Sequence, residues 1–258
     1  MTARIIAIAN QKGGVGKTTT AINLATALAA VGELVTLIDL DPQGNASTGL
    51  GVNAASRGAG TYSAFVHGTD VFDLAVKTPI PGLGLVTANA DLVAAELELA
   101  HDPQREHKLQ NALRSASNKT GYILIDCPPS MGLLTLNALV AADSVLVPLQ
   151  CEFFALEGIS SLIASIDRTR LHLNPRLVLQ GIVLTMYDRR NNLSEQVAAD
   201  ARAYFGTMVY AAMIPRNVRV SEAPSHGKPV LLYDFKSPGA QAYIHLAAEF
   251  LKRERAVV

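Results

Sequence analysis

The stretch that decides the fold of this chain is Lys12-Gly13-Gly14-Val15-Gly16-Lys17-Thr18-Thr19. It follows the phosphate-loop pattern G-x-x-x-x-G-K-[ST], except that Gln11 stands where the pattern has its first glycine. Glycines in such a loop let backbone N–H groups curl around phosphate oxygens without a Cβ clash. We expect Lys17 to bring its charge to the outer phosphates and Thr18 to hold Mg²⁺. The stretch therefore predicts a nucleotide site.

The segments on either side agree with this prediction. Arg4–Ala9 is a short apolar run that suits a buried parallel strand, and Thr20–Ala29 has the spacing of a helix. A glycine loop between a strand and a helix places anions at the helix N-terminus, where free N–H groups and the helix dipole favour them.

Composition favours one large α/β domain over residues 1–258, because 49 % of the residues are hydrophobic and 17 % are charged. The formal net charge is zero, so no overall field draws the chain to nucleic acid. Residues 176–258 hold 11 Lys+Arg and 7 Asp+Glu, a surplus of 11 − 7 = +4, which on charge alone is ordinary solvated surface.

The two cysteines, Cys127 and Cys151, do not form a C-x-x-C pair. They are expected to be small buried thiols in a reducing cytoplasm. No signal peptide is visible, and no apolar run reaches the roughly 20 residues that span a bilayer. We therefore expect a cytoplasmic protein without a membrane partner.

Apolar runs and helical patterns alternate along the chain, which predicts a mostly parallel twisted sheet with helices on both faces. Residues 45–61 are rich in small residues and are expected to form a mobile loop. The expected strands are Arg4–Ala9, Leu34–Ile38, Leu83–Ala88, Tyr122–Asp126, Ser144–Leu149, Leu177–Met186 and Met208–Ile214. The expected helices are Thr20–Ala29, Tyr62–His67, Leu92–Ala100, Glu106–Ala116, Leu133–Ala142, Leu156–Leu173, Leu193–Phe205 and Gly239–Arg253.

Aspartates follow two of the expected strands. Asp126 ends a strongly apolar strand, so we expect it near Mg²⁺, often through water. Asp39 and Asp41 follow the strand Leu34–Ile38. Asp41 is the better candidate for orienting the attacking water, and Asp39 is a candidate for the metal sphere or for supporting the loop.

Lys12 is unusual because the phosphate loop already has its cation in Lys17. A second lysine on the outer side of the loop has two possible targets. It either folds onto its own nucleotide or reaches the phosphates of a partner subunit, as an arginine finger does.

Five segments together resemble one family. Lys12–Thr18 looks like the deviant Walker A motif of the ParA/MinD superfamily, and Asp39–Asn45 and Ile123–Ser130 are similar to its second acidic motif and its Walker B segment. Ile214–Arg219 and Ser221–Pro229 look specifically like chromosomal ParA (Soj-type) partition ATPases, and the likeness covers nearly the whole chain.

This resemblance implies an ATPase with weak basal activity that forms ATP-dependent sandwich homodimers. Such dimers bind double-stranded DNA of the nucleoid without sequence specificity, and a ParB-type centromere-binding protein stimulates hydrolysis and releases them. The resemblance also implies that Lys12 contacts the nucleotide of the other subunit. Pro215 and Asn217 would line the adenine pocket.

DNA contact requires Lys and Arg side chains that converge on one face. Arg189 and Arg190 lie at an expected strand-to-helix loop where family members carry a DNA-binding arginine, and the sequence leaves open which of them has this role. The further candidates are Arg216, Arg219, Lys228 and Lys236.

Four alternatives compete with this interpretation. A MinD-like membrane-cycling ATPase needs a C-terminal amphipathic helix, and the chain end offers only Phe250 and Leu251 before mixed charges. A metabolic phosphoryl-transfer enzyme or ligase would need a substrate motif, and an iron–sulfur reductase would need paired cysteines. A plasmid rather than chromosomal ParA differs only in its cargo.

Overall fold

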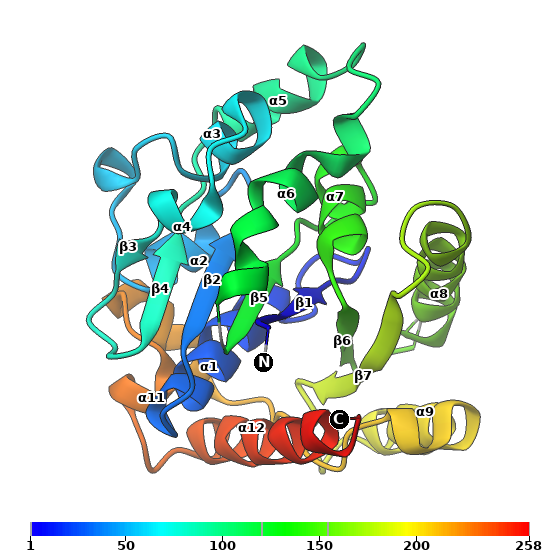
Figure 1. The fold of residues 1–258 in the computed structure, drawn as a ribbon. Helices are drawn as coiled ribbons and strands as arrows, with labels where there is room; N and C mark the ends of the chain where they lie inside the picture. Colours follow the sequence, from blue (N-terminus) through cyan, green and yellow to red (C-terminus); the bar gives the residue numbers. More distant parts are fainter. Residues whose placement is uncertain (1, 120, 154, 258) are drawn as a thin grey trace.

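The computed structural model describes residues 2–119, 121–153 and 155–257. Within this described part, one seven-stranded sheet has the strand order β3-β4-β2-β5-β1-β6-β7. All neighbouring strands are parallel except β3 and β4, which are antiparallel. β5 is the central strand, and β1, which leads into the phosphate loop, lies between β5 and β6 (Figure 1). The predicted mostly parallel α/β architecture is thus confirmed.

The strands run β1 Arg4–Ile8, β2 Val35–Asp39, β3 Val76–Lys77, β4 Leu83–Val86, β5 Tyr122–Asp126, β6 Ser144–Gln150 and β7 Val178–Thr185. The α-helices run α1 Lys17–Ala30, α2 Asn45–Gly49, α3 Gly60–His67, α4 Val71–Leu74, α5 Leu92–Glu98, α6 Lys108–Ala112, α7 Leu133–Ala141, α8 Ala155–His172, α9 Asn192–Phe205, α10 Val218–Glu222, α11 Val230–Tyr233 and α12 Pro238–Val257. Short 3₁₀ turns are η1 Ala54–Ser56, η2 Arg105–His107, η3 Arg114–Asn118, η4 Gly206–Met208 and η5 Ala223–His226.

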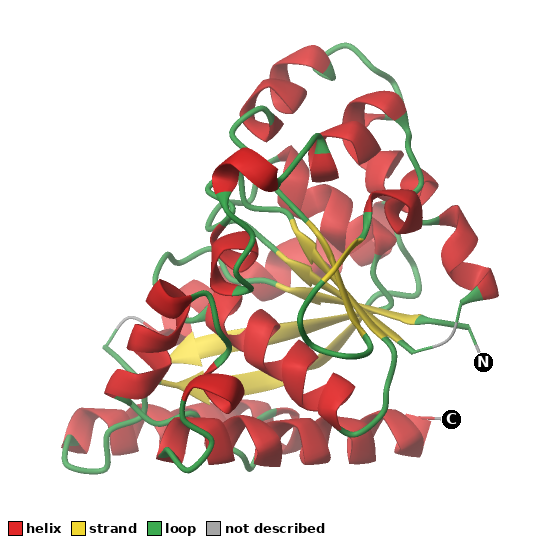
Figure 2. Cartoon of the chain, turned by 90° about the vertical axis from the view of Figure 1, so that its left-hand side faces the viewer, coloured by secondary structure: helices red, strands yellow, loops and turns green. Residues whose placement is uncertain are grey.

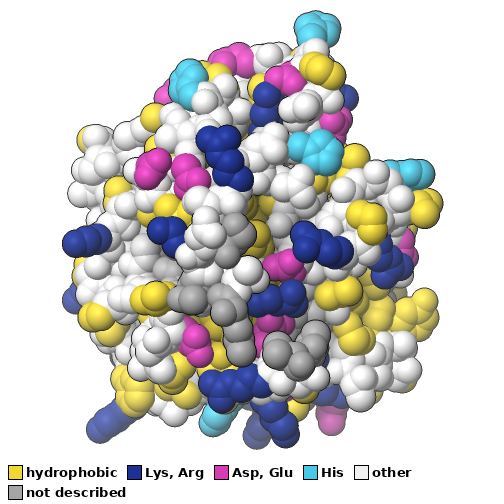
Figure 3. All heavy atoms as spheres, viewed as in Figure 1, with side chains coloured by type: hydrophobic (Ala, Val, Ile, Leu, Met, Phe, Trp, Pro, Cys, Tyr) yellow, Lys and Arg dark blue, Asp and Glu magenta, His cyan; other side chains and the backbone are white. Residues whose placement is uncertain are grey.

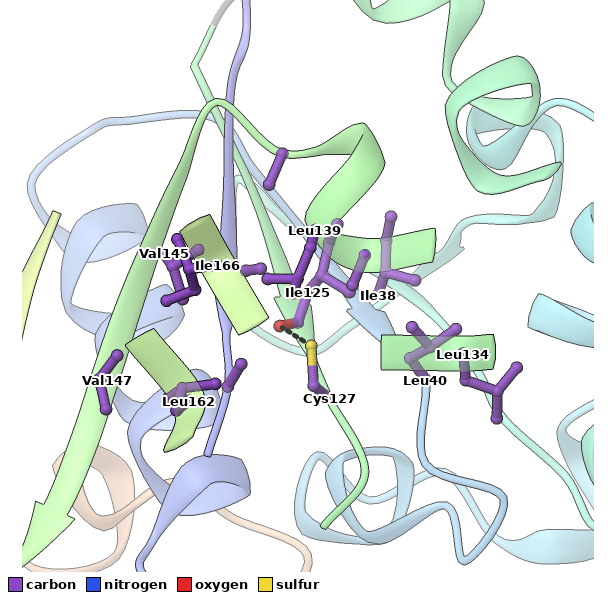
Figure 4. Packing of buried hydrophobic residues seen from close by; sticks show 14 of the residues in the cluster. Ile38, Leu40, Ile125, Cys127, Leu134, Leu139, Val145, Val147, Leu162 and Ile166 are labelled. Atoms are coloured by element: carbon purple, nitrogen blue, oxygen red, sulfur yellow. Dashed lines mark hydrogen bonds between the residues drawn. The ribbon is translucent and has the colours of Figure 1, made fainter. Parts of the chain in front are cut away.

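Each face of the sheet carries its own apolar cluster, because side chains alternate along every strand. In β1, Ile6 and Ile8 point to the cluster that α1, α11 and α12 cover, and Ala7 points to the other. Helices α7 and α8 pack on that second face, where Leu134, Leu139, Leu162 and Ile166 meet the strands (Figure 4). Seen along the sheet, helices lie on both of its sides (Figure 2). The layers bury the central strands on both faces.

Both cysteines are buried free thiols, as expected. The thiol of Cys127 donates to the carbonyl oxygen of Ile125 at 3.8 Å, within the packed cluster (Figure 4). Burial raises the pKa of Cys127, and burial also raises the pKa of Cys151 to about 11. Both thiols stay protonated at neutral pH.

The predicted strand Met208–Ile214 is wrong. Gly206–Met208 forms a 3₁₀ turn, and from the predicted range only Val209 makes a bridge, to Ile182 of β7. Val209, Tyr210 and Ile214 are nonetheless buried. The segment follows the edge of β7 and donates to it from the N–H groups of Tyr210, to Ile182 at 2.9 Å, and of Ile214, to Leu184 at 2.8 Å, but it does not form a continuous strand.

The predicted helix Glu106–Ala116 is broken into η2, α6 and η3. The cause is the side chain of Asn137 on α7, which donates to the carbonyl of Arg105 at 2.8 Å and accepts from the N–H of Leu109 at 3.1 Å. These bonds satisfy backbone groups that a continuous helix would pair internally.

Residues 45–61 are not one open loop as the sequence suggested, because they include α2 and η1. Arg57 holds them in place by donating to the carbonyl of Ala88 at 3.3 Å and to the hydroxyl of Thr48 at 2.6 Å. The two-residue strand β3 was not predicted, because two residues carry no periodic signal.

Candidate nucleotide-binding site

The phosphate loop connects β1 to α1 at the centre of the sheet. Its conformation needs glycine at Gly14 and Gly16, whose φ angles are 76° and 88°, in the left-handed region. Gly16 is also the N-cap of α1, and its carbonyl accepts from the N–H of Thr20 at 2.9 Å. The hydroxyl of Thr185 on β7 donates to the carbonyl of Val15 at 2.8 Å. The loop is therefore fixed at the N-terminus of a helix of 14 residues, a suitable place for anions.

The two loop lysines have different surroundings. Lys17 is 6 % exposed, and its Nζ donates to the carbonyl of Lys12 at 3.0 Å. Burial lowers the pKa of Lys17, and the carboxylate of Asp126 opposes that shift. Lys12 points outward, and its ammonium forms an ion pair with Glu152 of the same chain.

Asp39 and Asp126 lie side by side, because β2 and β5 pair in parallel register and both strands end on these residues. In the same register, Asp126 is also opposite Ile8 of β1, just before the phosphate loop. The two strand ends that carry these aspartates therefore lie beside the start of the phosphate loop.

Asp126 is fully buried, and neither of its carboxylate oxygens has a hydrogen-bond partner among the described residues. Burial, followed by the neighbouring charge of Asp39, raises the pKa of Asp126 well above its ordinary value. Thr18 opposes this shift, although no hydrogen bond between the two side chains is formed. A buried carboxylate without partners, next to a threonine hydroxyl, fits a hard cation such as Mg²⁺.

Asp39 is better satisfied than Asp126. Its carboxylate accepts from the N–H and hydroxyl of Ser47, at 2.8 and 2.7 Å, and from the N–H of Asp41 at 3.3 Å. Burial raises the pKa of Asp39 to about 6, against the effect of the Ser47 bonds. These contacts favour the supporting role that the sequence proposed for Asp39 over direct metal ligation.

Asp41 sits in the turn that follows β2. One of its carboxylate oxygens accepts from the N–H of Gln43 at 3.0 Å, and its carbonyl accepts from Gly44 at 2.8 Å. The residue is 8 % exposed, so the turn holds it at the rim of the site. This position suits a residue that aligns the attacking water rather than one that binds the metal ion directly.

A cavity of about 390 Å³ adjoins the loop. It brings Pro215 and Asn217 together with Gly16 and Thr19, as expected for a base pocket beside a phosphate site. Asn217 also caps α10 by accepting from the N–H of Val220 at 3.3 Å. A rigid proline edge and an asparagine amide beside the loop are suited to an adenine ring.

The candidate DNA contacts do not all converge. Arg189, Arg190 and Arg216 line one cavity of about 640 Å³, which shares Pro215 and Asn217 with the base pocket. Arg219 lies outside that cavity and pairs with Glu222 at 2.9 Å. The exposed Lys228 also lies outside it.

Several residues of the site were not predicted. Ser47 supports Asp39, Thr185 supports the loop, and Glu152 pairs with Lys12. Asn23 joins two distant segments, because its amide donates to the carbonyl of Thr19 and its oxygen accepts from the N–H of Val230, both at 2.8 Å. The contacts of Thr185, Glu152 and Val230 join residues that are remote in sequence, so no local pattern indicates them.

The chain is similar to proteins of one family. A model described as an AAA domain (AAA_31) matches residues 3–179. A chromosome partitioning protein ParA of Caulobacter vibrioides is 61 % identical over 98 % of this chain and 95 % of that protein. The sporulation initiation inhibitor protein Soj of Bacillus subtilis is 50 % identical over 95 % of this chain and 97 % of that protein.

Solved structures give the same result. A cobyrinic acid a,c-diamide synthase from Mycobacterium smegmatis with bound ADP and magnesium has a TM-score of 0.86 and 36 % identity, covering 99 % of this chain and 97 % of its own. The cell division ATPase MinD of Pyrococcus furiosus has a TM-score of 0.79 and 27 % identity, covering 97 % and 99 %. Together with the geometry of the loop and its aspartates, these likenesses establish that the chain belongs to the ParA/MinD family of chromosome-partitioning ATPases.

Proposed function

We propose that this protein is a chromosome-partitioning ATPase that binds ATP with Mg²⁺, closes as a homodimer and then binds DNA without sequence specificity. Hydrolysis is weak until a ParB-type partner stimulates it, and it releases the protein from the nucleoid. The observation that carries the proposal is the pairing of a phosphate loop containing Lys12 with the aspartates at the ends of β2 and β5. The 61 % identity to a chromosome partitioning protein over nearly the whole chain supports the choice of process.

Different residues of the site would bind the phosphates, the base, the metal ion and the attacking water. Backbone N–H groups from Gly13 to Thr19, with Lys17, would bind the phosphates, while Pro215 and Asn217 would hold the base. Thr18 and Asp126 would hold Mg²⁺, which supplies charge neutralisation for phosphoryl transfer when bound. Asp41 would align the attacking water. Lys12 would complete the charge around the phosphates of the partner subunit, so catalysis would depend on closure.

The alternatives are weaker. In α12, Phe250 and Leu251 are buried against the face that α1 covers, which leaves them unable to enter a bilayer interface. No helix among the described residues is both long and apolar enough to cross a membrane. One structural neighbour is a synthase, but its 36 % identity is well below the 61 % of the partitioning protein from Caulobacter vibrioides, which disfavours the ligase alternative.

Sedimentation with and without ATP and DNA tests the proposal. We expect co-sedimentation with DNA only when ATP is present, and a steep loss of binding as salt increases. Pelleting with liposomes in place of DNA would favour the membrane-cycling alternative.

Two variants test the assigned roles in the same assay. Lys12→Ala should retain nucleotide binding but lose the ATP-dependent dimer, and an unchanged dimer would remove the role of Lys12 in the partner's site. Asp41→Ala should accumulate as a dimer on DNA, since binding is kept while water is no longer aligned. Normal hydrolysis by that variant would contradict the role of Asp41.

A further inference from the structure

The outer lip of the phosphate loop, Gln11 and Lys12, is attached to the segment that connects β6 with α8. The ammonium of Lys12 pairs with the carboxylate of Glu152, which lies between those two elements. On α8, the hydroxyl of Ser161 donates to the side-chain oxygen of Gln11 at 3.2 Å. Two independent contacts therefore hold the lip to the β6–α8 connection and to α8 of the same subunit.

The backbone of Lys12 is fixed separately. Its N–H donates to the side-chain oxygen of Asn10 at 3.0 Å, and its carbonyl accepts from Lys17 at 3.0 Å. Asn10 is itself held, because its amide donates to the carbonyl of Pro148 in β6 at 2.7 Å. With the backbone fixed, the direction of the Lys12 side chain depends on its partner Glu152.

The side chains of this pair are accessible, with 42 % of Lys12 and 35 % of Glu152 exposed. The Lys12 ammonium carries a single positive charge. While Glu152 balances part of that charge, the ammonium attracts a second anion, such as a phosphate, less strongly. Glu152 also lines the base pocket together with Gly16 and Thr19, so the pair lies at the mouth of the site. While Lys12 remains with Glu152, its ammonium is held in a contact within its own subunit.

We propose that Glu152 is a positioning residue that holds Lys12 back in the single subunit and so raises the ATP concentration at which two subunits close. This inference rests on the proposed function, in which Lys12 acts on the partner's nucleotide. Closure then exchanges one ion pair for another in each subunit. Glu152 restrains assembly until a triphosphate competes successfully for the lysine.

The size of the effect follows from the exposure of the pair. Measured exposed ion pairs correspond to roughly 2- to 5-fold in an equilibrium constant. Because both subunits of a dimer must release their lysine, removing the pair should lower the dimer dissociation constant by about 4- to 25-fold. The effect should shrink as salt is added, since salt screens an exposed pair.

The test measures the dimer dissociation constant by sedimentation in a non-hydrolysable ATP analogue, without DNA. Glu152→Gln should form tighter dimers than the unmodified protein, by the factor above, and the two constants should converge at high salt. Glu106→Gln is the matched control, because Glu106 makes an equally exposed pair with Arg105 at 3.0 Å on η2. An unchanged or weaker dimer in Glu152→Gln would overturn the inference, and a weaker one would indicate that Glu152 contacts the closed assembly directly.

A second readout follows the lysine itself. In the nucleotide-free protein, Lys12 should react faster with an amine-directed acylating reagent when Glu152 is glutamine, as measured by mass spectrometry, while Lys252 should not change. Equal rates at Lys12 would contradict the inference. The Lys12→Ala variant separates the two ideas: if it still forms dimers, the proposed function fails, whereas loss of dimers with no effect of Glu152→Gln refutes only the role of Glu152.

Discussion

At the scale of single residues, the site combines one well-satisfied carboxylate with one that has no partners. Asp39 accepts three hydrogen bonds, whereas neither oxygen of Asp126 accepts one from the part of the chain that the structure describes. Both residues end neighbouring strands, so the difference comes from their surroundings and not from their position in the sheet. A buried polar group without a partner destabilises a fold, and such groups concentrate where a protein performs chemistry.

The carboxylate of Asp126 leads to a prediction about the stability of the fold. In the absence of nucleotide, Asp126→Asn should raise the free energy of unfolding by about 1–2 kcal/mol, because the raised pKa of Asp126 means that folding must either bury its charge or take up a proton, and an amide does neither. The same variant should lose the stabilisation that ATP with Mg²⁺ gives over ATP with EDTA. For the unmodified protein the stabilisation by bound ligand is about 2.7 kcal/mol at a hundredfold excess over the dissociation constant.

Thermal and denaturant unfolding with each ligand measure both effects. Asp73→Asn serves as the control, because Asp73 is exposed on α4, and neither quantity should change. If Asp126→Asn keeps the full Mg²⁺-dependent stabilisation, then Asp126 does not hold the metal.

At the scale of elements, the start of the sheet depends on a close approach of two segments. Gly121 precedes β5 with a φ of 96°, and a Cβ there would lie 2.0 Å from the carbonyl oxygen of Leu34. The same carbonyl accepts from the N–H of Tyr122 at 2.8 Å, so the contact belongs to the β2–β5 pairing. This glycine therefore lets the two aspartate-bearing strands pair from their first residues.

Gly121→Ala should consequently destabilise the fold by about 3 kcal/mol or more, through both strain and a clash with the backbone. Gly68→Ala is the matched control, since Gly68 has a φ of 66° but open space around its Cβ position. It should cost only about 1 kcal/mol. Chemical denaturation compares the two variants, and similar losses would show that the close approach to Leu34 does not matter.

Elements also show what the sequence can predict. The strand β1, from which the loop starts, and its neighbour β5 were predictable, because both are apolar runs that are largely buried. The broken helix near Glu106 was not, since the asparagine that interrupts it belongs to α7. Likewise, the loop, Asp39, Asp41 and Asp126 follow from local motifs, whereas Ser47 and Glu152 act through contacts that only the folded chain creates.

At the scale of the whole molecule, cationic side chains are dispersed. On the face in Figure 3, Lys and Arg lie scattered among acidic and apolar groups, in keeping with a net charge of zero. The proposed binding to DNA would then depend on a local group, and Arg189, Arg190 and Arg216 around one cavity are the best candidates. Two subunits would double that group, which explains why affinity for a polyanion should require the dimer.

The structure distinguishes the two adjacent arginines. Arg190 makes an ion pair with Asp188 at 2.9 Å, and this contact lowers the pKa of Asp188 to about 2. The carboxylate is therefore charged at any pH above about 3, and the pair is lost only as the pH falls through about 2. Arg189 is exposed and has no ion pair among the described residues, so its charge is available.

Arg189→Ala should accordingly weaken DNA binding and reduce the slope of log affinity against log salt by about 1. Arg190→Ala should change the slope little, because its charge is already balanced. Fluorescence anisotropy with a duplex, in ATP and at several salt concentrations, measures both slopes. Equal losses for the two variants would show that Asp188 releases Arg190 when DNA binds.

The amide of Asn23 has a consequence for anyone who recombines members of this family. It fastens the backbone at Val230, in the final portion of the chain, to the helix that begins at the phosphate loop. A chimera that swaps only that final portion would inherit a foreign surface but keep its own anchoring side chain. The protein that supplies the final portion and the protein that receives it should therefore both carry asparagine at the position of Asn23.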